Sequence, residues 1–381
     1  MADVFVRLAR RLDRLPNGFP ATADGVELAI LRKLFTAEEA AWALRLKPIP
    51  ETAATIARRL RVPVAEVRDT LDAMAARGLI ASFKMRGVVH YALVPFIIGI
   101  YEFQLQRLDR DLAELFEAYA PTLLATLGGA APALARVVPV NIRLETRPAV
   151  LPYEDLRAML DACRSFRVAE CLCRKERGLL GKPCRHPAET CLSFARDEGA
   201  YQGMPPWGRV ISKEEAFDVL DLAEREGLVH CTYNFQRDPF FVCNCCSCCC
   251  GFLRGVKEFG APYVLAPSSL VATIHRESCS ECGECTARCP MGAIAAGGDG
   301  LAVDAQRCVG CGLCATSCPS DAVALAPRPA TQQPRTPTTI VDWSVERMTH
   351  RRGPLHGLAL RGWLAWEGLK MLATRRTPGG S

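Results

Sequence analysis

Cysteines dominate the chemistry that this sequence can perform. The chain has 381 residues, of which 20 are cysteine. Two runs, "CSECGECTARCP" and "CVGCGLCATSCP", share the spacing C-x2-C-x2-C-x3-C-P. Their cysteines are Cys279, Cys282, Cys285 and Cys289 in the first run and Cys308, Cys311, Cys314 and Cys318 in the second. Thiolates this close together need a cation to be held at low cost, so the spacing indicates metal coordination.

The duplicated motif resembles the bacterial-type ferredoxin domain with two [4Fe–4S] clusters, over residues 268–326. In that family the first three cysteines of a run ligate one cube and the last ligates the other. The resemblance implies one cluster on Cys279, Cys282, Cys285 and Cys318, and a second on Cys308, Cys311, Cys314 and Cys289. A pair of zinc sites is the alternative, because C-x2-C also occurs in zinc ribbons. The resemblance implies low-potential transfer of single electrons.

Two further stretches are rich in cysteine. "ECLCRKERGLLGKPCRHPAETCLSF" contains Cys171, Cys173, Cys184 and Cys191, and "FVCNCCSCCCGF" contains Cys243, Cys245, Cys246, Cys248, Cys249 and Cys250. Basic residues in the first stretch would lower the pKa of the thiols and offset their charge: Arg174, Lys175, Arg177, Lys182 and Arg185. We interpret the first stretch as a metal site, to which His186 could contribute. Redox-active thiols and buried structural cysteines are the alternatives.

Geometry limits what the second stretch can do. In a strand, Cys243 and Cys245 would share one face, whereas in a helix Cys245, Cys248 and Cys249 would do so. No single cube can use all six thiols. We expect some of them to complete the site begun by Cys171 and Cys173, or to hold a further cluster. Cys163 and Cys231 stand alone in the sequence and are expected in the core.

The elements around these cysteines predict a multidomain α+β fold. We expect a winged-helix-like domain at 1–100, and a helical linker at the start of a mixed α/β, cysteine-rich middle domain at 101–262. A ferredoxin-like dicluster domain is expected at 263–327. A linker and one amphipathic helix, at about 354–373, follow at 328–381. Apolar spacing predicts one helix over 101–128, which could dock on the next domain or pair with a second copy of the chain.

The N-terminal region resembles the winged helix-turn-helix of bacterial regulators. The pattern predicts helices at about 51–60 and 64–77, then a hairpin that turns at Arg86-Gly87. The resemblance implies DNA as a partner. However, Glu66, Asp69 and Asp72 lie on the helix that would enter the major groove, where phosphate would repel them. We therefore favour protein docking or dimerisation for this region over DNA binding.

Location is expected to be cytoplasmic. The N-terminus lacks the continuous apolar core of a secretory signal, and no apolar run reaches the ~18 residues of a membrane span. Twenty cysteines in a reducing compartment are not a disulfide framework. The helix at 354–373 carries Trp363 and Trp366 among basic residues and could lie on a membrane surface or on a partner.

These observations favour an iron–sulfur electron carrier that works with a redox partner protein. The arrangement is similar to multidomain 4Fe–4S proteins of anaerobic bacteria, which implies additional iron–sulfur content and no particular reaction. Two alternatives are open: a redox-responsive regulator that binds DNA, and an oxidoreductase whose centre is in the middle domain. The sequence carries no phosphate-binding G-x4-G-K-[ST] and no G-x-G-x-x-G after a strand, so no nucleotide or flavin site is recognisable.

Overall fold

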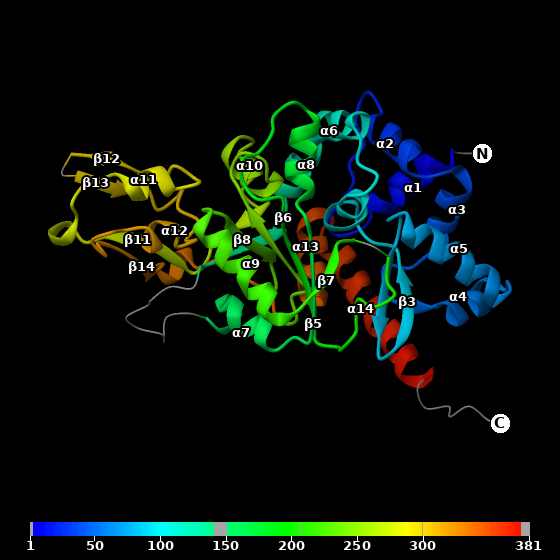
Figure 1. The fold of residues 1–381 in the computed structure, drawn as a ribbon. Helices are drawn as coiled ribbons and strands as arrows, with labels where there is room; N and C mark the ends of the chain where they lie inside the picture. Colours follow the sequence, from blue (N-terminus) through cyan, green and yellow to red (C-terminus); the bar gives the residue numbers. More distant parts are fainter. Residues whose placement is uncertain (1–2, 141–150, 206, 299, 375–381) are drawn as a thin grey trace.

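The computed structural model describes residues 3–140, 151–205, 207–298 and 300–374. Figure 1 shows N-terminal helices in blue at one end, a central sheet in green, and a small cysteine-rich unit in yellow and orange at the other end. The last two helices, in orange-red, lie beside the sheet and the N-terminal region. The cysteine-rich unit therefore contacts the sheet on the side away from the N-terminal helices.

The N-terminal region consists of helices and one small sheet. Its helices are α1 (Val4–Asp13), α2 (Val26–Leu34), α3 (Ala37–Arg45), α4 (Ala53–Leu60), α5 (Val64–Ala76) and α6 (Arg110–Gly128); its strands are β1 (Glu51–Thr52), β2 (Ala81–Met85) and β3 (Val88–Ala92). The strands pair in the order β1-β3-β2. The two predicted helices and the hairpin turn at Arg86-Gly87 are confirmed at the level of these elements. The interpretation as a winged helix stays a prediction.

The predicted helix over 101–128 is wrong in its first part. The regular helix α6 begins only at Arg110, because the side chain of Asp109 accepts a hydrogen bond from the backbone N–H of Leu112 at 2.8 Å and caps it there. Ile97 has extended backbone angles, and residues 102–104 form one short 3-10 turn. The irregular segment places Tyr101 and Glu102 against the middle of the molecule.

The central sheet has seven strands in the order β10-β4-β8-β9-β6-β5-β7. They are β4 (Ala135–Val138), β5 (Ser165–Glu170), β6 (Glu189–Ala195), β7 (Arg209–Ile211), β8 (Val229–Tyr233), β9 (Phe241–Cys245) and β10 (Leu265–Ala266). Neighbouring strands are antiparallel except β4 and β10. Helices α7 (Leu156–Asp161) and α9 (Lys213–Arg225) pack on one face, where Leu192, Phe194 and Val242 point. The cysteines of β6, β8 and β9 therefore point to the other face.

Helices α8 (Leu172–Leu179) and α10 (Gly251–Lys257) begin next to this cysteine-bearing face. Cys171 is the residue before α8, and Cys250 is the residue before α10. Further along the chain, the small unit pairs β11 (Leu270–Ile274) with β14 (Val323–Pro327), and β12 (Ile294–Gly297) with β13 (Gly300–Val303). Short helices α11 (Glu284–Arg288) and α12 (Leu313–Thr316) lie within the two cysteine runs.

The C-terminal segment is part of the core. It forms α13 (Ile340–Arg352) and α14 (Pro354–Thr374), which confirms the predicted helix at 354–373. Trp343 is buried and donates from Nε1 to the carbonyl of Ala133 at 2.8 Å. Arg347 is fully buried and donates to four carbonyl oxygens, those of Pro16, Leu127, Ala130 and Pro132. No helix among the described residues is long and apolar enough to cross a bilayer.

Arg347 should be one of the most important single residues for stability. Burial lowers the pKa of its guanidinium to about 10, so it remains charged at neutral pH. Replacing it (Arg347→Met) leaves four buried carbonyls without their donor, and we expect the free energy of unfolding in urea to fall by about 3 kcal/mol or more. The control is Arg335→Met, which removes an exposed ion pair with Glu346 and should cost less than about 1 kcal/mol. Equal losses for the two variants would contradict the prediction.

Candidate metal centres

The two cysteine runs have the same spacing but differ in burial. In the first run Cys282 is exposed and residues 275–278 around its start are exposed as well. In the second run Cys311 and Cys314 are buried, at 8% and 7% exposure. The second loop packs so closely that a Cβ at Gly310, whose φ is +67°, would lie 2.1 Å from the carbonyl oxygen of Leu270. The first run thus forms an outer loop and the second an inner loop.

The structure also places the last cysteine of each run. Cys318 lies close to Cys285, whose thiol pKa is raised by burial and, to a smaller extent, by Cys318. Burial raises the pKa of Cys314 to about 12, and Cys308 and Cys289 add to the shift. The backbone N–H of Ala293 donates to Cys289 Sγ at 3.2 Å, and that of Ala322 donates to Cys318 Sγ at 3.3 Å. That the fourth ligand of each cluster comes from the other run stays a prediction. It agrees with the positions of Cys318 near Cys285 and of Cys289 near Cys314.

The ten candidate metal residues of the middle domain fall into two groups. Cys184, Cys246, Cys248 and Cys249 form one group, here called the thiol quartet, whose sulfurs all lie within 4.8 Å of one another. Cys184 Sγ is 3.8 Å from Cys246 Sγ and 3.7 Å from Cys248 Sγ, and Cys248 Sγ is 3.7 Å from Cys249 Sγ. The structure thus brings Cys184 to three cysteines of the second stretch, and Cys173 packs against the same buried cluster as Cys184. The metal site expected on Cys171, Cys173, Cys184 and Cys191 stays a prediction. Cys184 lies in the loop before β6, whereas Cys191 is carried into the sheet by that strand.

The other six candidates, together with Cys231, form a second set, here called the seven-thiol group. Its members are Cys171, Cys173, Cys191, Cys231, Cys243, Cys245 and Cys250. Strand register explains its centre, because Cys231 of β8 lies opposite Cys243 of β9, and Leu192 of β6 lies opposite Val242. One step further along the same register, Cys191 faces Cys243. As predicted for a strand, Cys243 and Cys245 share a face of β9.

Interactions between these thiols shift their acidities in opposite directions. Contact with Cys191 and Cys245 lowers the pKa of Cys243 well below its usual value, whereas contact with Cys243, together with burial, raises that of Cys191. Contact with Cys173 lowers the pKa of Cys171, with further help from Arg174. Cys231, expected in the core, is fully buried but interacts with Cys245. Cys163 lies, as expected, in the core, within the buried cluster that α7 and α9 form with the sheet.

Arg174 lies between the two groups of thiols. Its buried guanidinium donates to the carbonyls of Pro187 and Asn244 at 2.6 and 2.7 Å, and to Thr190 Oγ1 at 2.6 Å. Burial acts to lower its pKa, but Cys171 and Cys246 outweigh burial and raise it. Contact with Cys249 is the main cause that lowers the pKa of Cys246 to about 4, and Arg174 contributes. One fixed cation thus stabilises thiolates of both groups.

Of the other predicted side chains, several point away from the sulfurs. Lys175 donates to the carbonyl of Leu105 at 2.6 Å, and Arg177 pairs with Glu117 at 2.9 Å. His186 is not a member of the thiol quartet; its Nδ1 lies 3.7 Å from a carboxylate oxygen of Glu226. Lys182 and Arg185 are exposed on the loop that carries Cys184. Of the five basic residues that the sequence suggested, Arg174 is the one whose interaction with cysteines the structure shows.

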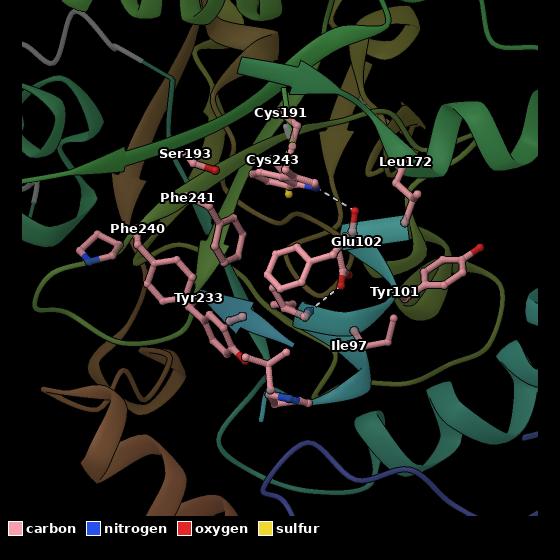
Figure 2. Close-up of a pocket in the computed structure, with 18 of the residues that line it drawn as sticks. Ile97, Tyr101, Glu102, Leu172, Cys191, Ser193, Tyr233, Phe240, Phe241 and Cys243 are labelled. Atoms are coloured by element: carbon pink, nitrogen blue, oxygen red, sulfur yellow. Dashed lines mark hydrogen bonds between the residues drawn. The ribbon is translucent and has the colours of Figure 1, made fainter. Parts of the chain in front are cut away.

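The seven-thiol group borders a cavity of about 1840 Å³, between the N-terminal region, the sheet and the C-terminal helices. Figure 2 shows Cys191 and Cys243 near Glu102, with Tyr233, Phe240 and Phe241 on another side. The partial exposure of Cys171, Cys173, Cys191 and Cys243 is exposure to this space. The wall is otherwise mostly apolar, which is typical of a binding cavity.

Glu102 was not singled out by the sequence. Its carboxylate accepts a hydrogen bond from the backbone N–H of Gly99 at 2.6 Å, and its carbonyl accepts one from Trp207 Nε1 at 2.8 Å. Its exposed surface faces the cavity, and burial raises the pKa of the carboxyl group to about 8. The signal was present: Glu102 is the one charged residue in "LVPFIIGIYEF". A lone carboxylate in an apolar run indicates a buried or functional position.

A comparison with known protein families identifies the part of the chain that contains the two cysteine runs. A family model described as a 4Fe-4S dicluster domain matches residues 272–325. Residues 272–325 are a 4Fe-4S dicluster domain, which implies two [4Fe–4S] clusters in this part of the chain. Searches of curated proteins and of solved structures gave no match.

The dicluster domain contacts the seven-thiol group through its inner loop. One buried cluster of side chains contains Cys231, Cys245 and Cys250 together with Cys311 and its neighbours Val309 and Leu313. The backbone N–H of Val140, just after β4, donates to the carbonyl of Cys311 at 2.9 Å. On the far side of the contact, Arg288 of α11 donates to the carbonyl of Arg225 at 2.7 Å. The Val140 bond fixes the inner loop beside the sheet, and the Arg288 bond holds the first run against the end of α9.

Glu102 should make stability depend on pH. Its ordinary pKa is 4.5, and in the folded protein it is about 8. Between these values the unfolded chain has released a proton that the folded protein retains, so the free energy of unfolding falls as pH rises through this window. Glu102→Gln removes that loss, so we expect the variant to gain stability relative to the natural protein from about pH 5 to about pH 8, by a few kcal/mol at most.

The measurement is urea unfolding of both proteins at the two pH values. Glu198→Gln, which changes an exposed carboxylate, is the control and should leave the pH dependence as it is. A stability difference between Glu102→Gln and the natural protein that does not change with pH would show that this carboxyl group titrates normally.

Proposed function

We propose that the protein is an iron–sulfur electron-transfer protein that transfers electrons from a redox partner protein to a third redox centre. Electrons enter at the outer cluster of the dicluster domain and pass to the inner cluster. From there they reach an iron–sulfur centre held by members of the seven-thiol group. The contact between the inner loop and Cys231, Cys245 and Cys250 is the observation that carries this proposal.

The difference in burial between the two loops gives the path its direction. The outer loop is accessible to a partner protein, and exposed Glu277, Glu281 and Glu284 give it acidic character. A redox partner with a basic surface around its own centre would be attracted there. The inner loop has no such access, since it is covered by the sheet. A cluster at Cys311 is therefore placed to relay electrons inward.

The spacing of the seven thiols suits a cluster of several irons. Among the described residues, the thiol quartet is the group of metal-binding side chains whose ligand atoms all lie within 4.8 Å of one another, and no three of the seven thiols meet that limit. In the described part of the chain they form no group compact enough to be a candidate for one small ion. An iron–sulfur cube carries its irons at separate corners and so spreads its thiolates further apart. Arg174 would offset part of the negative charge of such a centre.

The cavity favours a second candidate within the same scheme. If the third centre reacts with a substrate, the space of about 1840 Å³ beside Cys191 and Cys243 would admit it, and the protein would be an oxidoreductase. Under the first candidate the same centre passes its electrons to a partner. A compound that reoxidises the reduced protein and competes for the cavity would favour the second.

The number of irons tests the proposal. Protein purified without oxygen should contain about twelve irons and about twelve acid-labile sulfides per chain, and EPR of the reduced form should show a signal beyond those of the dicluster domain. Cys243→Ser should lower the iron content to about eight and remove the extra signal, because the third centre loses a ligand.

Cys163→Ser is the matched control, since Cys163 is also a middle-domain thiol but lies in the core behind the sheet. It should retain the full iron content. About eight irons in the natural protein, or unchanged iron in Cys243→Ser, would limit the redox chemistry to the dicluster domain and overturn the third centre.

A further inference from the structure

We propose that the thiol quartet binds a single zinc ion in tetrahedral geometry and belongs to no iron–sulfur cluster. The ion would be structural, holding the loop before β6 against the turn after β9. This inference goes beyond the proposed electron path, which uses other thiols. It rests on the juxtaposition of Cys184, Cys246, Cys248 and Cys249.

The distances fit one ion. Zinc binds thiolate sulfur at about 2.3 Å, and tetrahedral angles then place neighbouring sulfurs about 3.8 Å apart. The three contacts between quartet sulfurs measure 3.7, 3.7 and 3.8 Å. All four sulfurs lie within 4.8 Å of one another, so the remaining pairs depart little from the same geometry. A cube of four irons would push its thiolates further apart than this.

The ligand set is closed. Four thiolates fill the coordination of a tetrahedral zinc and leave no position for water or substrate, which is the pattern of structural sites. Cys246 and Cys249 are buried, whereas Cys248 is exposed and Cys184 is partly so. The exposed side provides a route for the ion to enter. The buried side packs against Ala223 and Leu228 at the end of α9, which keeps the sulfurs in place.

The charge of the site is also accounted for. Four thiolates around a divalent cation leave two negative charges. The guanidinium of Arg174 interacts with Cys246 and is held by its bonds to Thr190 and Asn244. It therefore offsets part of this charge from a fixed position. Arg174 would be an outer partner of the kind that orients ligands and tunes their charge.

The position of the ion suggests what it stabilises. It would join two segments 62 residues apart in the chain, one following α8 and the other following β9. Cys171 immediately precedes helix α8, which carries Cys173 and Arg174, and β9 carries Cys243 and Cys245. A cross-link between these segments would fix the two sides of the seven-thiol group relative to each other. The zinc would thus stabilise this part of the fold without binding the irons or taking part in electron transfer.

The test is metal analysis of the full chain, purified without oxygen, with iron and zinc measured in the same samples. The natural protein should contain about one zinc per chain. Cys248→Ser should lose that zinc and keep its iron. Cys248→His replaces one zinc ligand by another and should retain the ion, which separates loss of a ligand from misfolding.

Cys243→Ser serves as the opposite control, because it alters the seven-thiol group and should leave zinc unchanged. Substituting cobalt for zinc should give the absorption bands of a tetrahedral thiolate complex in the natural protein and none in Cys248→Ser. No zinc in the natural protein, a single iron in its place, or loss of iron in Cys248→Ser would overturn the inference. If the proposed third redox centre does not exist, the natural protein will contain fewer irons but the same zinc. This result can be told apart from failure of the zinc site.

Discussion

The interaction of the buried Arg174 guanidinium with cysteines of both groups is central to the middle domain. Eleven cysteines cover one face of a sheet and the turns beside it, and their ionised forms repel one another. A single buried guanidinium, held by three hydrogen bonds, reaches Cys171 on one side and Cys246 on the other. Its charge adds to the contacts with other cysteines that lower the pKa of Cys171 and of Cys246. Arg174 is also fixed by the same short helix that carries Cys173, so charge and ligands are positioned together.

The division of the thiols into two groups follows from strand register and loop geometry. Strands β6, β8 and β9 align Cys191, Cys243 and Cys231 in a row, where neighbouring side chains are about 5 Å apart. The turn after β9 is not bound by this spacing, and it folds Cys246, Cys248 and Cys249 together. Adjacent cysteines in one sequence motif thus belong to two groups of thiols with different spacing. The sheet supplies wide spacing and the turn supplies close spacing.

Sequence reasoning succeeded where spacing alone decides the structure. The two runs of four cysteines, the helices α4 and α5 and the turn at Arg86-Gly87 depend on residues within a few positions of one another. It could not group the middle cysteines, because the distance between Cys184 and Cys248 depends on how β6 and β9 pair. Cys231 is buried as expected, but its contacts with other thiols could not be read from the sequence, since its neighbours come from other strands. Helix α13 was also missed, although its capping box at Thr339 and Asp342 was visible in the sequence.

The position of α13 has a consequence for how the protein is made. Trp343 lies in the core between the N-terminal region and the sheet, and the start of the helix forms part of the cavity wall. This helix follows Cys191 and Cys243 in the chain, so the side of the sheet that bears these two thiols stays uncovered until the helix has been synthesised. These thiols are therefore accessible for a period before the chain closes over them, and the iron and sulfide of the proposed third centre would have to be delivered in that period.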